Sequence, residues 1–218
     1  MNIEGLDYCC LPQLRNESDC NYNIGGSVKA LVFSDVHMPF QSDNMIEIVK
    51  NVISDIQPEV IVLDGDVIDF YQISRFISSD ERISTIQNDI DQATDFMSDI
   101  KRLAPRSRFI FIPGNHEDRL WKYIATESAA LSNLSALKLE NLLQLKALGF
   151  EFYNSKKNVL LLNDLNIIHG YIVRKHAGYS AKAMLDDLGM SCMQGHTHRV
   201  GIVGKTLGDR TIYGYEIG

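Results

Sequence analysis

Residues 60–69 read Val-Ile-Val-Leu-Asp-Gly-Asp-Val-Ile-Asp, an apolar run that ends in a turn rich in carboxylates. Four consecutive branched aliphatic residues favour a β-strand that is buried on both faces, as in a parallel sheet. The acids follow at the point where this strand ends. The stretch therefore predicts an α/β fold with polar side chains at the carboxyl edge of its sheet.

The same order, an apolar run and then a polar turn, occurs on both sides of this stretch. Upstream, residues 30–33 are apolar and precede Ser34 and Asp35. Downstream, residues 109–112 precede the turn Pro113-Gly114-Asn115-His116. Three strands that each end in polar residues predict one edge of a sheet at which these residues gather.

Helical periodicity separates these strands. Residues 42–56 place their apolar side chains on one face, with Ser42 or Asp43 as the cap, and complete a βαβ unit. A longer helix is expected over residues 80–103, and a further helix over residues 117–127. The acids of the longer helix are expected on a solvated face; they are Asp89, Asp91, Asp95 and Asp99.

The second half of the chain is richer in short strands. We expect a mainly helical segment over residues 131–148 and a helix over residues 179–188. The expected strands are residues 150–153, 158–162, 166–168, 192–194, 199–205 and 210–217. Helices between strands in the first half and short strands in the second predict an α/β fold with a mixed sheet or two packed sheets.

Length and composition favour one folded domain. With 218 residues, 45% hydrophobic and 22% charged, the chain fits a single domain over residues 28–218. Residues 1–27 are polar and are expected to form an irregular N-terminal arm. The net charge of −7 argues against a protein that coats nucleic acid, although it does not exclude an enzyme that handles one phosphate.

Neither a membrane span nor a disulfide framework is expected. No apolar run approaches the roughly 20 residues that cross a bilayer, and the N-terminus lacks the order of a signal peptide. The four cysteines form no C-x-x-C pair, so reduced thiols are expected; a metal site at Cys9, Cys10 and Cys20 would have only three ligands. These features predict a cytoplasmic protein.

Five of the six histidines lie in four short motifs: Asp-x-His at residues 35–37, Gly-Asn-His-Glu at 114–117, His-Gly at 169–170 and Gly-His-Thr-His at 195–198. Taken singly, each motif could be a turn with a structural histidine, but each also follows a predicted strand. Together they indicate a metal site. The candidate ligands are Asp35, His37, Asp66, Asn115, His169, His196 and His198.

The ligand types indicate the kind of metal. Imidazole and oxygen ligands without thiolates suit manganese, iron or zinc better than the oxygen-only sites of calcium and magnesium. Seven ligands exceed what one tetrahedral ion needs, whereas two ions that share a carboxylate would use them all.

In this order, the motifs resemble the successive signatures of the calcineurin-like metallophosphoesterase superfamily over residues 35–198. The resemblance implies two packed mixed β-sheets flanked by helices, in four α/β/β/α layers. It implies two divalent ions, Mn²⁺ in the first place, with Fe, Zn²⁺ or Ni²⁺ as alternatives. One ion would be bound by Asp35, His37 and His198 and the other by Asn115, His169 and His196, with Asp66 as the bridge.

The resemblance also assigns roles next to the metals. His116 would protonate the leaving oxygen, and Asp69 would orient its imidazole; the alternative for Asp69 is a helix cap after the turn. From the residues alone, Arg174 and His176, in the basic segment that follows the candidate ligand His169, are candidates for binding the substrate, as is Arg119; a solvated turn is the alternative for each. Phe70, Tyr71 and Phe76 could stack on a base, although a place in the core is the more common role of such aromatics.

The implied activity is hydrolysis of a phosphomonoester or phosphodiester by a water activated between two metal ions. The expected partner is a phosphorylated substrate, a nucleotide or a nucleic acid end; the oligomeric state is not predicted. One alternative is a protein phosphatase, which the residues after Asp69 (Phe70-Tyr71) and Glu117 (Asp118-Arg119) disfavour. Others are a non-catalytic metal-binding interaction module and a single ion that only stabilises the fold.

Overall fold

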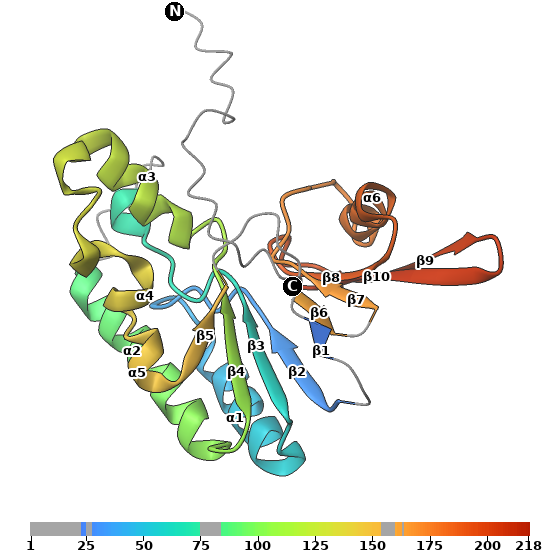
Figure 1. Ribbon diagram of the computed structural model, residues 1–218, viewed down its shortest axis with the longest axis horizontal. Coiled ribbons are helices and arrows are strands. Elements are labelled where there is room, and N and C mark those ends of the chain that lie inside the picture. Colours follow the sequence, from blue (N-terminus) through green and yellow to red (C-terminus); the bar gives the residue numbers. More distant parts are fainter. Residues whose placement is uncertain (1–22, 25–27, 75–83, 154–159, 163) are drawn as a thin grey trace, which may run out of the picture.

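Two β-sheets packed against each other form the centre of the protein, with helices on both outer sides (Figure 1). The computed structural model describes residues 23–24, 28–74, 84–153, 160–162 and 164–218. Helices α1 and α2 cover the outer face of one sheet, and α6 covers the outer face of the other. The predicted fold, α/β with two sheets flanked by helices, is confirmed.

The first sheet has four described strands in the order β2-β3-β4-β5, all parallel. They are β2 (Ala30–Phe33), β3 (Val60–Asp64), β4 (Arg108–Ile112) and β5 (Phe150–Phe152). Helices α1 (Asp43–Ile56) and α2 (Ile86–Leu103) pack on this sheet and enclose the largest hydrophobic core.

The second sheet is mixed, with six described strands in the order β1-β6-β7-β8-β10-β9. They are β1 (Asn23–Ile24), β6 (Leu160–Leu162), β7 (Leu165–Ile167), β8 (Ser191–Gln194), β9 (Val200–Leu207) and β10 (Arg210–Ile217). Strands β9 and β10 form a long antiparallel hairpin that projects to one side in Figure 1. Helix α6 (Tyr179–Leu188) packs Met184 and Leu185 against this sheet.

Strand β3 is buried on both faces, as its unbroken apolar sequence predicted. Its alternate residues serve two cores: Ile61 and Leu63 face the helices, whereas Val60 and Val62 face the second sheet. There, Val60 and Val62 pack in one cluster with Ile167 of β7. This contact between the sheets brings the ends of their strands to one common edge.

Most predicted elements have the expected bounds. Helix α3 (Glu117–Glu127), α6 and β10 begin and end where the pattern placed them. The segment expected to be mainly helical over residues 131–148 is broken into short pieces, because Leu134 and Lys138 have extended backbone conformations and Gln144 has a left-handed one with φ 51°. The pieces are the 3₁₀ turns η2 (Ala129–Leu131) and η3 (Ser135–Leu137) and the helices α4 (Leu139–Leu142) and α5 (Leu145–Leu148).

The prediction for the start of α2 and for one of its acids was wrong. The helix begins at Ile86, with the Thr85 hydroxyl accepting a hydrogen bond from the Asn88 N–H, and residues 84–85 precede it; residues 80–83 lie outside the described part. Asp89 is buried rather than solvated. Its carboxylate accepts hydrogen bonds from the Ser84 hydroxyl at 2.5 Å and the Gln72 amide at 2.6 Å. Periodicity alone could not identify these partners.

Some predictions fall at the edges of the described chain. Asn23 and Ile24, within the segment expected to be irregular, pair with β6 as β1; residues 1–22 and 25–27 lie outside the description, so a domain boundary at residue 27 stays a prediction. Cys9, Cys10, Cys20 and Phe76 also lie outside it, and Cys192 is a buried free thiol.

Two of the aromatics considered for stacking on a base, Phe70 and Tyr71, are buried in the core. Tyr71 is the first residue of the short turn η1 (Tyr71–Ile73). Among the described residues, no helix has the length and apolarity needed to cross a membrane.

Replacing Asp89 with alanine should destabilise the protein, because the Gln72 amide and the Ser84 hydroxyl would lose their buried acceptor. We expect the free energy of unfolding to fall by about 1–3 kcal/mol, measured by urea denaturation. Asp95→Ala is the matched control, since Asp95 is an exposed acid of the same helix. Equal effects of the two substitutions would show that the buried hydrogen bonds of Asp89 contribute nothing.

Candidate metal centre

The seven candidate ligands meet at the edge where strands of both sheets end. Asp35 and His37 follow β2, Asp66 follows β3, and Asn115 follows β4. From the second sheet, His169 follows β7, and His196 and His198 follow β8. Backbone hydrogen bonds join the first two turns, from Asp35 N–H to the Gly65 carbonyl at 3.1 Å and from His37 N–H to the Asp66 carbonyl at 2.9 Å. The strand-end argument from the sequence therefore describes the arrangement well.

The backbone at this edge is strained. Of the eight non-glycine residues with positive φ in the described chain, five are candidate ligands: Asp35, His37, Asp66, His196 and His198, with φ between 51° and 68°. A left-handed conformation at a residue with a side chain costs of order 1–3 kcal/mol and is commonly found at functional sites. The strain thus points to this edge as a functional site, independently of the residue types.

One group of possible ligand atoms comprises Asp35, His37 and His198. The Nε2 atoms of His37 and His198 lie 3.0 Å apart, and the His198 Nε2 lies 3.3 Å from Asp35 Oδ1. The other ring nitrogen of His37 lies 3.0 Å from Asp69 Oδ2, which fixes the ring so that its Nε2 faces the group. Asp35 is held by the Ser34 hydroxyl and by the His196 N–H.

A second group comprises Asp66, His169 and His196. His169 Nε2 lies 3.0 Å from Asp66 Oδ2 and 3.3 Å from the amide oxygen of Asn115. The His169 Nδ1 lies 2.6 Å from the Asp64 carbonyl, and a donated proton there leaves Nε2 available as a ligand. In this way a backbone carbonyl orients the second group as a carboxylate orients the first.

The carboxylate of Asp66 lies between the two groups. Besides His169, its Oδ2 atom lies 3.9 Å from His37 Nε2, and the set His37, Asp66 and His116 forms a third possible metal group. Its other oxygen accepts a hydrogen bond from the His116 N–H at 2.8 Å. With only 1% of its surface exposed, Asp66 is the one side chain among the seven that contacts both sets of imidazoles. The donor set, imidazole nitrogens with carboxylate and amide oxygens, suits divalent ions such as Mn²⁺, Fe²⁺ or Zn²⁺.

Two glycines allow the turns to approach this closely. A Cβ atom added to Gly65, whose φ is +81°, would lie 2.5 Å from His169 Nδ1. A Cβ added to Gly114 would collide with the Asp66 carboxylate and lie 2.8 Å from His169 Nε2. Glycine at both positions is thus required by the packing of the ligands themselves.

Glu117 is the last residue of the Gly-Asn-His-Glu motif, and no role was predicted for it. In the structure its buried carboxylate accepts four backbone hydrogen bonds: from Val67 and Ile68 to Oε1 at 2.8 and 3.1 Å, and from Asp66 and Gly114 to Oε2 at 2.9 and 2.7 Å. It therefore ties the turn after β3 to the turn after β4. An acid at the first position of a helix that follows a ligand turn was the available signal.

A second layer of polar groups flanks the ligands. Asp69 Oδ2 lies 3.1 Å from His116 Nδ1, as well as 3.0 Å from His37 Nδ1. The Arg119 guanidinium donates to Asp69 Oδ1 at 2.9 Å, and its other terminal nitrogen lies 3.0 Å from His116 Nε2. Burial opposes ionisation of Asp69, but its hydrogen bonds with His116 and His37 outweigh this and hold its pKa well below the usual range. Asp69, His116 and Arg119 thus form one connected network.

The other two candidate substrate residues lie elsewhere. Arg174 and His176 are exposed on the segment before α6, where Arg174 donates to the Val173 carbonyl and His176 packs edge-on against Tyr179. In the described chain, no hydrogen bond or ion pair joins either side chain to a candidate ligand. The structure brings together the seven candidate ligands, His116, Asp69 and Arg119, but not these two.

The ionisation of the two groups follows from their mutual contacts. Burial lowers the pKa of His37, but Asp35 and Asp69 outweigh this and raise it to about 9. Burial likewise opposes the charge on His169, and Asp66 raises its pKa to about 10. Burial also opposes ionisation of Asp35, yet its contacts with His37 and Ser34 lower its pKa to about 2. Without a bound cation, these carboxylates therefore keep two imidazoles protonated near neutral pH.

Comparison with known proteins yields one family and two viral relatives. A family model described as calcineurin-like phosphoesterase matches residues 28–206. The Gene 54 protein of Mycobacterium phage D29 is 29% identical over 209 residues, covering 88% of this chain and 79% of the relative. The Gene 54 protein of Mycobacterium phage L5 is 27% identical with the same coverage. The names of these relatives carry no information about a substrate.

A histidine must lose its extra proton before its imidazole can bind a metal ion, so metal binding should release protons. We expect about two protons per chain near pH 7, one from His37 and one from His169, whose pKa values of about 9 and about 10 keep them protonated beforehand. Calorimetric titration with Mn²⁺ in two buffers of different ionisation enthalpy measures this number. An apparent enthalpy that is the same in both buffers would contradict the expectation.

Glu117→Gln should loosen the turns after β3 and β4. The carboxylate now accepts hydrogen bonds from four backbone N–H groups, and the NH₂ group of glutamine, which is a donor, would face two of them. We expect the free energy of unfolding to fall by about 1–3 kcal/mol and the affinity for Mn²⁺ to fall with it. Glu127→Gln, at the exposed end of the same helix, is the matched control. Unchanged metal affinity in Glu117→Gln would show that the turns hold their positions without it.

Proposed function

The chain belongs to the calcineurin-like phosphoesterase family, and from this premise we propose that it hydrolyses a phosphomonoester or phosphodiester with two divalent metal ions. The substrate class proposed is a nucleotide or a nucleic acid end. Mn²⁺ is the proposed metal, and the cytoplasm is the proposed location. The observation that carries the proposal is the buried Asp66 carboxylate between two groups of imidazoles.

Each group would hold one ion. Asp35, His37 and His198 would bind the first, Asn115, His169 and His196 the second, and Asp66 would contact both. Ions bound there would lower the pKa of a water molecule and neutralise charge on the phosphate oxygens. The orientation of His37 by Asp69 and of His169 by the Asp64 carbonyl supports this assignment, because both leave Nε2 directed at the group.

The chain's own acid would be His116. Its Nδ1 lies 3.1 Å from Asp69 Oδ2, and its Nε2 lies 3.8 Å from Asp66 Oδ2, so the ring reaches from the second layer to the ligands. Nε2, which now faces the Arg119 guanidinium, would carry the proton in place of that contact and deliver it to the leaving oxygen, while Asp69 holds the ring through Nδ1. Asp69 is thus better explained as a partner of imidazoles than as a helix cap.

Arg119 would contribute to substrate binding from the same network. Its guanidinium is fixed by two hydrogen bonds to Asp69, from one nitrogen to the carbonyl at 2.8 Å and to Oδ1 at 2.9 Å. A guanidinium held beside His116 can donate to a phosphate oxygen without a large loss of side-chain entropy. Arg174 and His176 stay in the proposal as groups that a longer substrate could contact.

Two substitutions test the mechanism in hydrolysis of bis-p-nitrophenyl phosphate and p-nitrophenyl phosphate by metal-stripped protein with Mn²⁺ added back; phenyl phosphate is added as an ester with a poorer leaving group. Asp66→Asn should lower kcat/KM more than about a hundredfold, because it weakens both metal groups. His116→Ala should lower kcat about 10²- to 10⁴-fold for a phenyl ester, whose leaving oxygen needs a proton, and less for the p-nitrophenyl ester. The ratio of diester to monoester turnover narrows the substrate class.

Asp95→Asn is the control, because this acid is exposed on α2. Folded protein that binds two metal ions and turns over neither compound would favour the non-catalytic interaction module. Equal losses for both leaving groups in His116→Ala would contradict its role as the acid. Loss of folding on removal of a single ion would favour a structural metal.

A further inference from the structure

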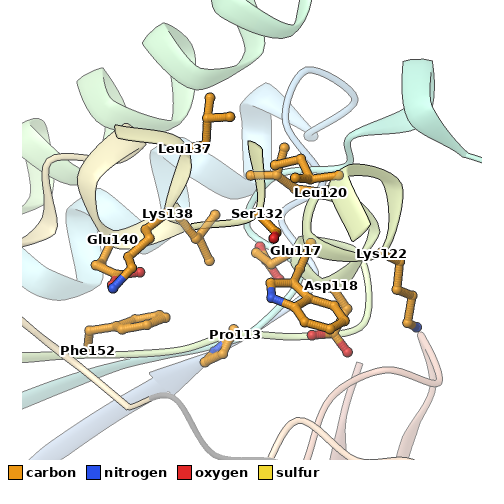
Figure 2. Close-up of a pocket in the computed structure, with 13 residues that line it drawn as sticks. Pro113, Glu117, Asp118, Leu120, Lys122, Ser132, Leu137, Lys138, Glu140 and Phe152 are labelled. Carbon is orange, nitrogen blue, oxygen red and sulfur yellow. The ribbon is translucent and has the colours of Figure 1, made fainter. Parts of the chain in front are cut away.

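A cavity of about 500 Å³ lies beside α3, between this helix, residues 132–140 and strand β5 (Figure 2). In Figure 2, Phe152, Glu140 and Lys138 stand on one side of the opening, Asp118 on the other, and Pro113 between them. Trp121 of α3 also lines it. The volume falls within the range of pockets that hold small molecules.

This cavity adjoins the candidate metal centre: none of the seven candidate ligands lines it, but Glu117, which joins the two ligand turns, does. Its lining includes Leu120, Trp121 and Ile124 of α3, whereas Arg119 of the same helix bonds to Asp69. At 3.6 residues per turn, Arg119 and Trp121 point in nearly opposite directions. Beyond its first turn, the helix therefore directs Arg119 toward the candidate metal centre and Trp121 toward the cavity.

The walls of the cavity are suited to a flat ring. Trp121 is 57% exposed, which is unusual for the largest apolar side chain, and Phe152 contributes a second aromatic group. Leu137 and Leu139 add further apolar surface. Aromatic side chains at an open pocket bind planar bases by stacking, with a contribution that does not depend on base identity.

Of the polar residues that line the cavity, Lys138 and Glu140 narrow the ligand class. Within the described part of the chain, neither side chain makes a hydrogen bond or ion pair. A ligand that uses both must carry an anionic group for the ammonium and N–H donors for the carboxylate. A fatty acid would satisfy Lys138 but would offer no donor to Glu140. Lys122 also borders the cavity, but its side chain is directed away from the opening in Figure 2.

We propose that this cavity is a second binding site that takes a nucleoside monophosphate. The base lies against Trp121 and Phe152, its amino group donates to Glu140, and its phosphate accepts from Lys138. The inference goes beyond the proposed hydrolysis, because the ligand need not be the substrate. It rests on the shape and chemistry of the cavity and would stand whichever phosphoester is cleaved.

The chain offers its own reporter, because Trp121 is the only tryptophan of the 218 residues. The experiment follows its fluorescence as the full chain is titrated with adenosine 5′-monophosphate. The same titration on the Asp66→Asn variant excludes turnover and binding at the metals. We expect a saturable change in both proteins, a weaker affinity for adenosine, and no change with ribose 5-phosphate, which lacks the base.

Variants of Lys138 test the anion contact. Lys138→Ala should weaken binding of adenosine 5′-monophosphate roughly tenfold, as expected for one lost hydrogen bond to a charged group, and should leave the affinity for adenosine unchanged. Lys138→Arg should retain most of the affinity. Lys146→Ala, which removes an exposed lysine of α5 outside the cavity, is the matched control and should bind like the wild type. Circular dichroism verifies that each variant is folded.

Three results would overturn the inference: no saturable change in Trp121 fluorescence, a change that disappears in Asp66→Asn, or equal affinities of the wild type and Lys138→Ala. Hydrolysis of bis-p-nitrophenyl phosphate by the wild type tests the proposed function without using the cavity. The failure of one proposal is therefore distinguishable from the failure of the other.

Discussion

The arrangement of the candidate metal centre depends on the buried carboxylate of Glu117. Its two oxygens accept four backbone N–H groups from two turns that are about 50 residues apart in the chain. These N–H groups have no strand partner, so without the carboxylate they would be buried and unsatisfied. One side chain thus fixes where Asp66 and Asn115 stand relative to each other. Backbone contacts with the turn after β3 then position Asp35, His37 and His169, and Asp35 in turn contacts His196 and His198.

The candidate ligands combine strained backbone conformations with closely spaced charged side chains. Five left-handed residues and a cluster of carboxylates and imidazoles would be unfavourable in a site that served only the fold. The carboxylates and protonated imidazoles partly compensate each other, which explains why the pKa values of Asp35 and His37 shift in opposite directions. The rest of the fold, above all the doubly buried β3, supplies the stability that such a site requires.

The sequence predicted well what depends on local pattern. The fold could be identified from the unbroken apolar run of β3 and the periodicity of α3 and α6. Polar residues at strand ends then predicted a common edge, where the structure places ten candidate residues. Contacts of buried polar groups that were not among these candidates were beyond local pattern. The burial of Asp89 depends on Gln72 and Ser84, and the function of Glu117 depends on backbone N–H groups far away in the chain. Arg174 and His176 were predicted to bind the substrate because they follow the candidate ligand His169 in the sequence, but in the structure their side chains do not contact the candidate ligands.

The two groups of ligands draw on both sheets. His198 joins Asp35 and His37, and Asp66 joins His169 and His196, so neither sheet carries a complete group. An ion in either group would act as a crosslink between the sheets, and its binding free energy would add to the cohesion of the apolar layer between Val62 and Ile167. Metal binding would therefore depend on the alignment of the two sheets, because a shift of one sheet by one residue relative to the other would separate the candidate ligands of both groups.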